Sequence, residues 1–187
     1  DMISGTVKNP LGSGVTGVMV EAITNTGMVA ASGYTLDDGL GSFTLNGLAD
    51  GLYRVQVTWL EDGFASSVAK DQIPMGYADA NFVLSVSYEL ASVSGSVPSA
   101  VRPLASGAGV SALPAAVQLW QGGRLVAAAS PDAGGRFSIR NLIPGNYVLK
   151  AAGPDGAWKS VPITLARGEN LQISPLGTLL RQASAYA

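Results

Sequence analysis

The chain has 187 residues, with 11 Lys and Arg, 13 Asp and Glu, and a formal net charge of -2 at pH 7. It contains no Cys and no His, which removes disulfides, thiolate metal sites, the commonest general base and the commonest metal ligand. These absences argue against an enzyme, and the lack of a basic stripe argues against nucleic-acid binding. We therefore expect no cofactor, no metal site and no nucleic-acid partner.

The composition is also apolar and weakly charged. Charged residues make up 13% of the chain and hydrophobic residues 47%, whereas about 25% of an average soluble domain is charged. No segment approaches the roughly 20 consecutive apolar residues that a membrane helix needs, because Gly, Ser, Asp or Arg interrupts each apolar run. We expect no membrane span, and we expect the apolar excess to be buried against protein.

Short runs of Val, Thr, Tyr, Phe and Trp between clusters of Gly, Asp, Asn and Pro predict strands and no helix. Seven short strands in about 85 residues are typical of an immunoglobulin-like β-sandwich. In the first half of the chain the predicted strands are Met2 to Lys8, Val15 to Thr24, Met28 to Thr35, Ser42 to Leu45, Leu52 to Leu60, Phe64 to Lys70 and Ala80 to Ser87.

The strand from Leu52 to Leu60 shows the clearest alternation. Tyr53, Val55, Val57 and Trp59 share one face, and polar side chains share the other. The first set is predicted to face the core.

The second half follows the same plan, with one longer connection from Pro98 to Pro114. Long loops in compact domains are often functional, but a tolerated insertion explains this loop equally well. The predicted strands here are Leu90 to Val97, Ala115 to Gln121, Arg124 to Ser130, Arg136 to Ile139, Tyr147 to Ala152, Trp158 to Leu165 and Asn170 to Ser174.

The two halves repeat one sequence pattern. Ile3-Ser4-Gly5-Thr6-Val7 recurs as Val93-Ser94-Gly95-Ser96-Val97, and the segment from Gly41 to Tyr53 recurs from Gly135 to Tyr147. Because the repeated positions are glycines, aromatics and aliphatics, the duplicated object is a folding unit and not a catalytic site. We predict an all-β chain of two tandem seven-strand sandwiches, residues 1–88 and 89–175, followed by a tail of residues 176–187.

The order of these motifs resembles the carboxypeptidase regulatory-like domains, which are related to the transthyretin-like (prealbumin-like) and collagen-adhesin B-type sandwiches. The resemblance covers almost all of the first repeat and, more loosely, the second. It implies non-catalytic domains of a secreted prokaryotic protein, located outside the cell or at its surface. The residues that carry it are Ser4-Gly5-Thr6-Val7, Gly17 to Ala22, Gly41 to Leu45, Leu48 to Val57 and Gly63-Phe64.

Collagen-adhesin B-type domains often carry an intramolecular bond between a Lys and an Asn, assisted by an acid. Lys8, Asn81 and either Glu21 or Glu61 are the residues that could form it here. The alternation of the first strand places Lys8 on the outward face, where its amine stays charged and non-nucleophilic. The sequence therefore argues against such a bond.

Several apolar side chains fall on strand faces that should meet water. A half-buried antiparallel strand is normally polar on that side. We expect a second copy or another protein to cover these side chains. They are Met19, Ile23, Val83 and Val148.

The tail extends beyond the repeated unit and contains several apolar residues. We predict that it docks on its own domain or on a neighbouring subunit, by strand addition at an open sheet edge. The residues expected to carry this contact are Leu176, Leu179, Leu180 and Tyr186.

Two further groups are candidates for ligand sites. Trp120 lies on the outward-facing side of its predicted strand, and Trp158 begins a strand. The two side chains could stack on a sugar, although packing at an interface or a sheet edge also accounts for both. Acidic pairs such as Asp37-Asp38 precede glycines but lack the alternating spacing of a calcium loop, which favours solvated turn acids.

Together these features predict a non-enzymatic structural subunit of an extracellular or cell-surface assembly, such as a filament, sheath or surface layer, that associates with itself into a homo-oligomer or polymer. The alternative is an accessory module that binds a glycan or a surface protein through Trp120, Trp158 and the long loop.

Overall fold

The computed structural model describes residues 1–86, 89–97, 117–152 and 157–173. These residues form fourteen strands and no helix, and so no helix among them is long and apolar enough to span a membrane. The chain divides into two compact units, the first formed by Asp1–Leu90 with Asn141–Gly145 and the second by the remaining residues. The long connection and the C-terminal tail fall outside the described residues.

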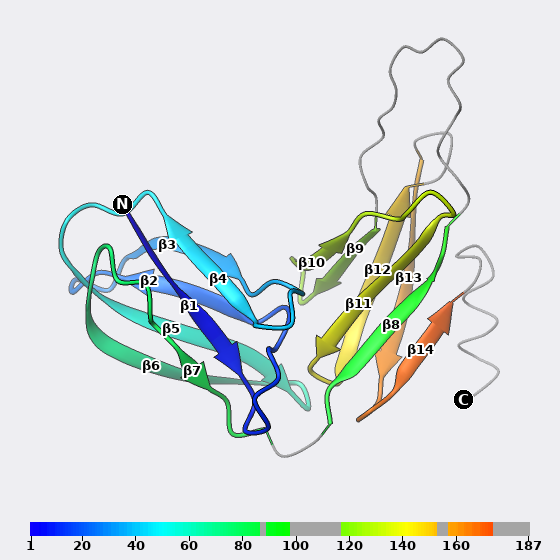
Figure 1. Ribbon diagram of the computed structural model, residues 1–187, viewed down its shortest axis with the longest axis horizontal. Helices are drawn as coiled ribbons and strands as arrows, with labels where there is room; N and C mark the ends of the chain where they lie inside the picture. The colour runs from blue at the N-terminus through cyan, green and yellow to red at the C-terminus, as the bar shows by residue number, and fades with distance from the viewer. Residues whose placement is uncertain (87–88, 98–116, 153–156, 174–187) are drawn as a thin grey trace, which may run out of the picture. The chain divides into compact units, whose positions relative to one another are not determined.

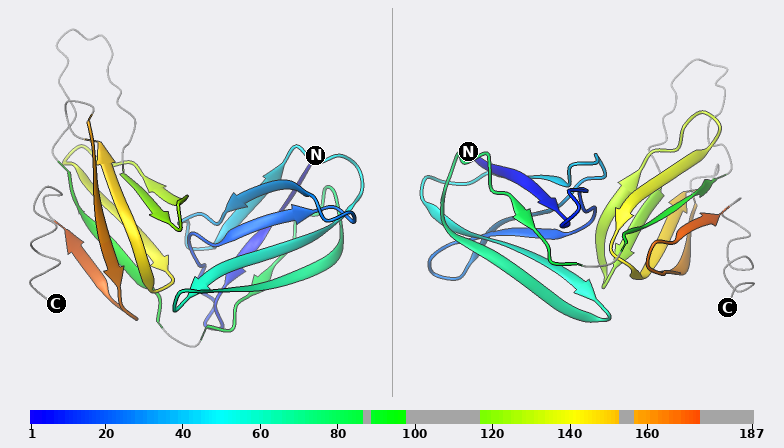
Figure 2. Two further views of the ribbon diagram at one scale, coloured as in Figure 1. Left: turned by 180° about the vertical axis from the view of Figure 1, so that it is seen from behind. Right: turned by 60° about the horizontal axis from the view of Figure 1, so that its bottom comes forward.

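The first unit is a sandwich of two sheets, drawn as separate layers in Figures 1 and 2. One sheet has the order β4-β1-β7 and the other the order β3-β2-β5-β6. The strands are β1 (Met2–Lys8), β2 (Met19–Ile23), β3 (Val29–Tyr34), β4 (Ser42–Asn46), β5 (Leu52–Glu61), β6 (Phe64–Pro74) and β7 (Phe82–Val83).

Period-two alternation forms the core of this unit. Tyr53, Val55 and Val57 on β5 are buried, as are Ile3, Gly5 and Val7 on β1, while the residues that alternate with them are half-buried or exposed. Trp59 is partly buried and packs against the same core. The predicted inward face of the fifth strand is therefore confirmed.

The second unit repeats the architecture, with sheets of order β11-β8-β14 and β10-β9-β12-β13. The predicted class, number of strands and most strand positions are therefore confirmed. The strands are β8 (Ala91–Ser96), β9 (Val117–Gln121), β10 (Arg124–Ala129), β11 (Arg136–Leu142), β12 (Gly145–Ala152), β13 (Trp158–Leu165) and β14 (Asn170–Ile173).

The repeated glycines mark close backbone approaches. In each unit the first strand pairs in parallel with the last, β1 with β7 and β8 with β14. A Cβ atom at Gly5 would overlap the carbonyl of Ala80, and one at Gly95 would overlap the carbonyl of Ile173. Glycine is therefore required at both positions because no side chain fits between the paired backbones.

The second strand is shorter than the predicted range Val15 to Thr24, because it begins only at Met19. The preceding segment is held by Thr35, whose hydroxyl donates to the carbonyl of Val15 (2.6 Å) and accepts from the amide of Val18 (2.9 Å). A buried side chain thus satisfies backbone groups that a sheet ladder would otherwise satisfy.

The last strand of the first unit is also shorter than predicted, since β7 contains two residues of the expected Ala80 to Ser87. Here the side-chain oxygen of Asn81 accepts hydrogen bonds from the amide and hydroxyl of Thr6, at 3.0 and 3.1 Å. This side chain takes the place of a backbone partner and interrupts the ladder.

Candidate functional site

A metal site would need several side chains that together could hold the ion. No group of three or more His, Cys, Asp or Glu side chains within the described ranges could hold a metal ion. The features that could give the chain a function are therefore surfaces: a hollow, the tryptophans, the outward apolar residues and a sheet edge.

The carboxylate of Asp38 stabilises the turn before β4. Burial raises its pKa, but hydrogen bonds from the side chain and amide of Ser42 and from the amides of Leu40 and Gly41 outweigh this and lower the pKa below its ordinary value. Its Oδ1 accepts from the amide of Leu40 at 2.9 Å and of Ser42 at 3.3 Å. Asp132 accepts two equivalent amide bonds in the second unit, so these carboxylates close the turn before β4 and β11.

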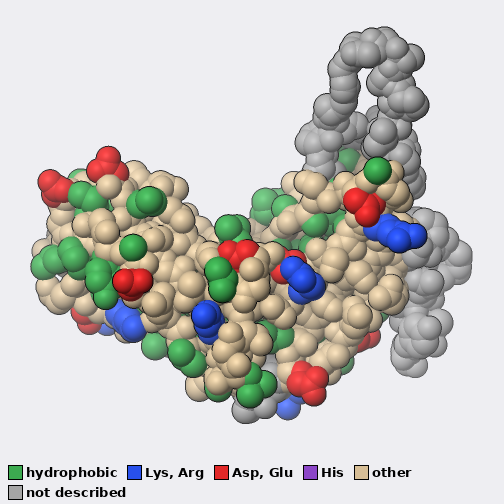
Figure 3. All heavy atoms as spheres, viewed as in Figure 1, with side chains coloured by type: hydrophobic (Ala, Val, Ile, Leu, Met, Phe, Trp, Pro, Cys, Tyr) green, Lys and Arg blue, Asp and Glu red, His purple; other side chains and the backbone are tan. Residues whose placement is uncertain are grey.

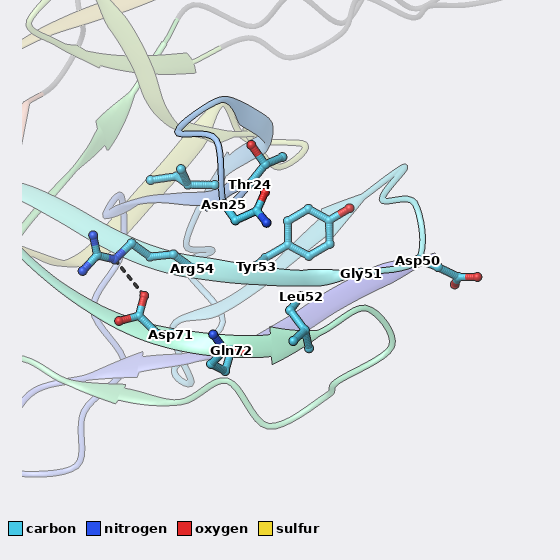
Figure 4. A pocket seen from close by; sticks show the side chains of 10 residues that line it. Thr24, Asn25, Asp50, Gly51, Leu52, Tyr53, Arg54, Asp71 and Gln72 are labelled. Atoms are coloured by element: carbon cyan, nitrogen blue, oxygen red, sulfur yellow. Dashed lines mark ion pairs between the residues drawn. The ribbon is translucent and has the colours of Figure 1, made fainter.

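An open hollow of about 420 Å³ lies along β5 and β6 in the first unit (Figure 4). The guanidinium Nε of Arg54 lies 3.0 Å from Oδ1 of Asp71, and the two side chains are about half exposed. The hydroxyl of Tyr53 donates to the carbonyl of Ala49 at 2.8 Å. Arg54 and Asp71 pair with each other and are exposed, and the Tyr53 hydroxyl is bonded to the backbone, so none of these three side chains is the buried, unpaired group that marks a reactive centre. Its lining residues are Ile23, Thr24, Asn25, Asp50, Gly51, Leu52, Tyr53, Arg54, Asp71 and Gln72.

The two tryptophans proposed for ligand stacking occupy different settings. Trp120 is half-buried on β9, its indole N–H donates to the side chain of Gln118 (3.0 Å), and the amine of Lys150 lies 4.3 Å from its ring centroid. Lys150 thus occupies one face of the ring by a cation–π contact. Trp158 begins β13 and is 49% exposed, so it keeps a surface that a ligand could reach.

The outward apolar residues predicted from the sequence differ in exposure. Val83 on β7 is 67% exposed, whereas Met19 and Ile23 on β2 and Val148 on β12 are half-buried. Val148 lies opposite Trp120, and Met19 lies opposite Tyr34, in the antiparallel registers of their sheets. Cross-strand neighbours on the outer face cover part of these three side chains. The tail residues Leu176, Leu179, Leu180 and Tyr186 lie outside the described residues.

A further apolar surface, not singled out from the sequence, lies on the edge strand β6. Phe64 is 77% exposed and Val68 is 41% exposed. Val68 lies opposite the buried Val57, so it belongs to the inner face of the sheet although it is exposed. The predicted strand Phe64 to Lys70 carried the signal, because it has no charge before Lys70, but only the sheet order shows that this strand is an edge.

Lys70 ends this uncharged run. Its amine donates to the backbone carbonyl of Asn81 and lies 5.2 Å from the ring centroid of Phe82. Lys70 lies opposite the buried Val55 in the ladder. Its side chain therefore projects from the inner face of the sheet towards Asn81 and Phe82, which belong to the opposite layer. The Lys70 side chain therefore covers one end of the inner face of β6. Val68, the neighbouring residue on this face, stays exposed.

Comparison with known proteins gives structural neighbours at low identity. No protein-family model matches the chain, and no curated protein matches it. Three solved structures that match are the Bacillus anthracis TIE protein (14% identity, TM-score 0.35), GBS52, the minor pilin of Streptococcus agalactiae (13%, 0.34), and BcpA, the major pilin subunit of Bacillus cereus (11%, 0.26). The alignments cover 92%, 92% and 93% of this chain and 33%, 93% and 69% of those chains, respectively.

The chain thus spans about a third of the TIE protein chain and nearly all of the GBS52 chain. The resemblance to carboxypeptidase regulatory-like domains stays a prediction.

Proposed function

We propose that the chain is a non-enzymatic structural subunit of an extracellular or cell-surface assembly, a filament, sheath or surface layer, built by contacts between copies of its sandwiches. The observation that carries this proposal is the distribution of exposed apolar side chains. Of the thirteen large hydrophobic residues exposed in the described ranges, eleven lie in the first unit. Exposed apolar side chains that share one unit are candidates for a surface that another protein covers.

The weak charge of the surface points the same way. In Figure 3 the charged side chains are few and separated by broad uncharged areas. Net charge far from zero keeps proteins apart, and a net charge of -2 on 187 residues provides little repulsion between copies. A heterologous contact between such copies, if it does not close on itself, produces a filament.

Sedimentation velocity on the intact chain over a range of concentrations, together with negative-stain electron microscopy, tests this function. We expect the sedimentation coefficient to rise with concentration in the absence of any ligand and ordered polymers to appear. A sharp monomer boundary at every concentration, with no particles larger than a monomer, would contradict the proposal.

The predicted docking of the tail needs its own experiment. If Leu176, Leu179, Leu180 and Tyr186 carry the contact between subunits, deletion of residues 177–187 should leave a folded chain that no longer polymerises. Polymers that persist in the shortened chain would exclude the tail as the contact and leave the sandwich surfaces, with Val83 the most exposed of the residues predicted from the sequence.

The exposure of Trp158 favours one second candidate, an accessory module that binds a glycan or a surface protein. A glycan array probed with the monomeric chain separates the two functions. Binding that is lost in Trp158→Ala and retained in Trp120→Ala would support the module, because Lys150 already occupies one face of Trp120.

A further inference from the structure

The edge strand β6 presents a regular, unprotected row of backbone groups. It is the last strand of the sheet β3-β2-β5-β6, and it pairs with β5 without interruption from Phe64 to Lys70. A register shift follows, and Gln72 has a φ of 61°, which ends the regular edge in a bulge. The seven residues of this β6 edge, Phe64–Lys70, contain no Pro and no charge before Lys70.

The equivalent strand of the second unit is protected. β13 is likewise the last strand of its sheet, β10-β9-β12-β13, but Pro162 lies within it and Lys159 near its start. Pro and Lys are the residues that proteins place on edge strands to prevent pairing with another chain. The repeat therefore offers an internal comparison, in which β13 carries Lys159 and Pro162 among its first five residues while the first six residues of β6 carry neither Pro nor charge.

Opposite charges flank the open run. Glu61, the last residue of β5, and Asp62 in the turn precede it, and Lys70 ends it. In an antiparallel pair of two β6 edges, the Lys70 end of each copy meets the acidic turn of the other, whereas a parallel pair would oppose like charges. Asp71, the next acid, is already neutralised by Arg54 at 3.0 Å.

From this complementarity we infer that the β6 edge pairs antiparallel with the β6 edge of a second copy of this chain, about a two-fold axis. Directly opposed residues in an antiparallel pair lie on the same face of the sheet. The two-fold axis must therefore pass midway between two copies of the same residue, which oppose each other. The register that pairs the whole of Phe64–Lys70 places Ser67 opposite Ser67 and Phe64 opposite Lys70.

This register also covers the exposed apolar residues. Phe64 of one copy lies opposite Lys70 of the other, where the Lys70 stem covers part of the Phe64 ring while the Lys70 amine stays bound to the Asn81 carbonyl of its own chain. Val68 lies opposite Ser66, on the inner face where it is exposed in the single chain. Pairing therefore extends both the sheet and its apolar face across the two copies.

The inference deepens the proposed function, since it names one contact through which the structural subunit would assemble. A single strand pair buries less than the roughly 1,200–2,000 Å² of a stable interface, so this contact alone is weak. It becomes effective in an assembly where other contacts hold the copies together.

A single cysteine tests the register. The chain has no Cys, so Ser67→Cys introduces the one thiol, on an exposed residue of the outer face. Opposed Cα atoms in an antiparallel pair lie about 4.5–5.5 Å apart, within the range that a disulfide spans. Under mild oxidation we expect Ser67→Cys to form a disulfide-linked dimer at least several-fold faster than two controls, Ala65→Cys, which pairs with Ala69, and Ser160→Cys on the β13 edge. Equal cross-linking of all three would overturn the inference.

A charge exchange tests the contact without oxidation. In a dimer of Ser67→Lys, two positive charges face each other across the axis, and in a dimer of Ser67→Asp two negative charges do. Each variant alone should therefore lose the association through β6, whereas an equal mixture of the two variants should regain it. Because Ser67 is exposed, both variants should keep the thermal midpoint of the parent chain, which separates loss of pairing from loss of folding. Association unchanged in both single variants would refute the pairing.

The outcomes separate this inference from the proposed function. Polymers that form normally in Ser67→Lys would leave the structural function standing and exclude the β6 contact. Specific cross-linking at Ser67 in a chain that never exceeds a dimer would support the β6 contact and exclude the polymer.

Discussion

At the scale of single residues, Gly5 has a role that its spacing alone does not reveal. A Cβ atom there would overlap the backbone of Ala80, which cannot move without separating β7 from β1. We expect Gly5→Ala to lower the free energy of unfolding by about 1–3 kcal/mol, as overpacking does. Urea unfolding measures the loss.

Gly33→Ala is the matched control for this substitution, since Gly33 also lies in a strand of the first unit. A Cβ atom at Gly33 would lie 3.6 Å from the carbonyl oxygen of Thr44, which is an ordinary contact distance. We expect Gly33→Ala to change the stability by less than about 1 kcal/mol. Equal losses in the two variants would show that the tight approach at Gly5 has no special energetic weight.

Asp38 provides a residue-scale prediction for pH. Burial raises its folded-state pKa, but amide and hydroxyl hydrogen bonds to the carboxylate outweigh burial and hold the pKa below the ordinary value of 3.8. A group with a depressed folded-state pKa stabilises the fold at pH values above its unfolded-state pKa, and this stability is lost as the pH falls through 3.8 towards the folded-state value.

Asp38→Asn keeps an acceptor oxygen but removes the titration. We therefore expect the parent chain to lose stability relative to Asp38→Asn as the pH is lowered below about 4, with little change in the difference between pH values of roughly 6 and 8. Thermal unfolding midpoints of both chains over this range provide the measurement. If the thermal midpoints of the two chains fall equally as the pH is lowered, another carboxylate causes the loss of stability in acid.

At the scale of elements, the strands were largely predictable because their signals are local. Alternation at Tyr53, Val55 and Val57 and the turn glycines both lie within a few residues of the strands that they define. The shortening of β2 and β7 was not predictable, because Thr35 and Asn81 bind backbone groups that only the tertiary fold brings near them. The exposed β6 edge was not predictable for the same reason, since the order of strands in a sheet depends on the whole unit.

The bulge that ends the β6 edge gives an element-scale prediction. Gln72 has a φ of 61°, a conformation that costs a residue with a Cβ atom roughly 1–2 kcal/mol and that glycine adopts freely. Gln72 already carries this cost, so Gln72→Gly should leave the free energy of unfolding unchanged or raise it, whereas Gln72→Val should lower it, because branching at Cβ disfavours the left-handed region further. Urea denaturation distinguishes them, and equal stability of the two variants would contradict the left-handed backbone at this position.

At the scale of the whole molecule, composition predicted that the surface would carry few charges, and the face drawn in Figure 3 carries few among its described residues. Composition could not show where the exposed apolar side chains would gather, because the two repeats have similar patterns. Among the described residues they are more numerous in the first unit, which emerges only when each side chain is placed on an inner face, an outer face or an edge.

This surface determines how salt should act on assembly. Exposed ion pairs contribute little and are screened by salt, so contacts that depend on charge weaken as sodium chloride is raised. Contacts between apolar side chains strengthen in sulfate, which is excluded from protein surfaces. For the intact chain we expect the weight-average sedimentation coefficient to change little between about 0.05 and 0.5 M sodium chloride and to rise in ammonium sulfate of the same ionic strength. Dissociation in sodium chloride would instead show that contacts between charged side chains hold the copies together. The exposed apolar residues of the first unit would then not form the contact between copies.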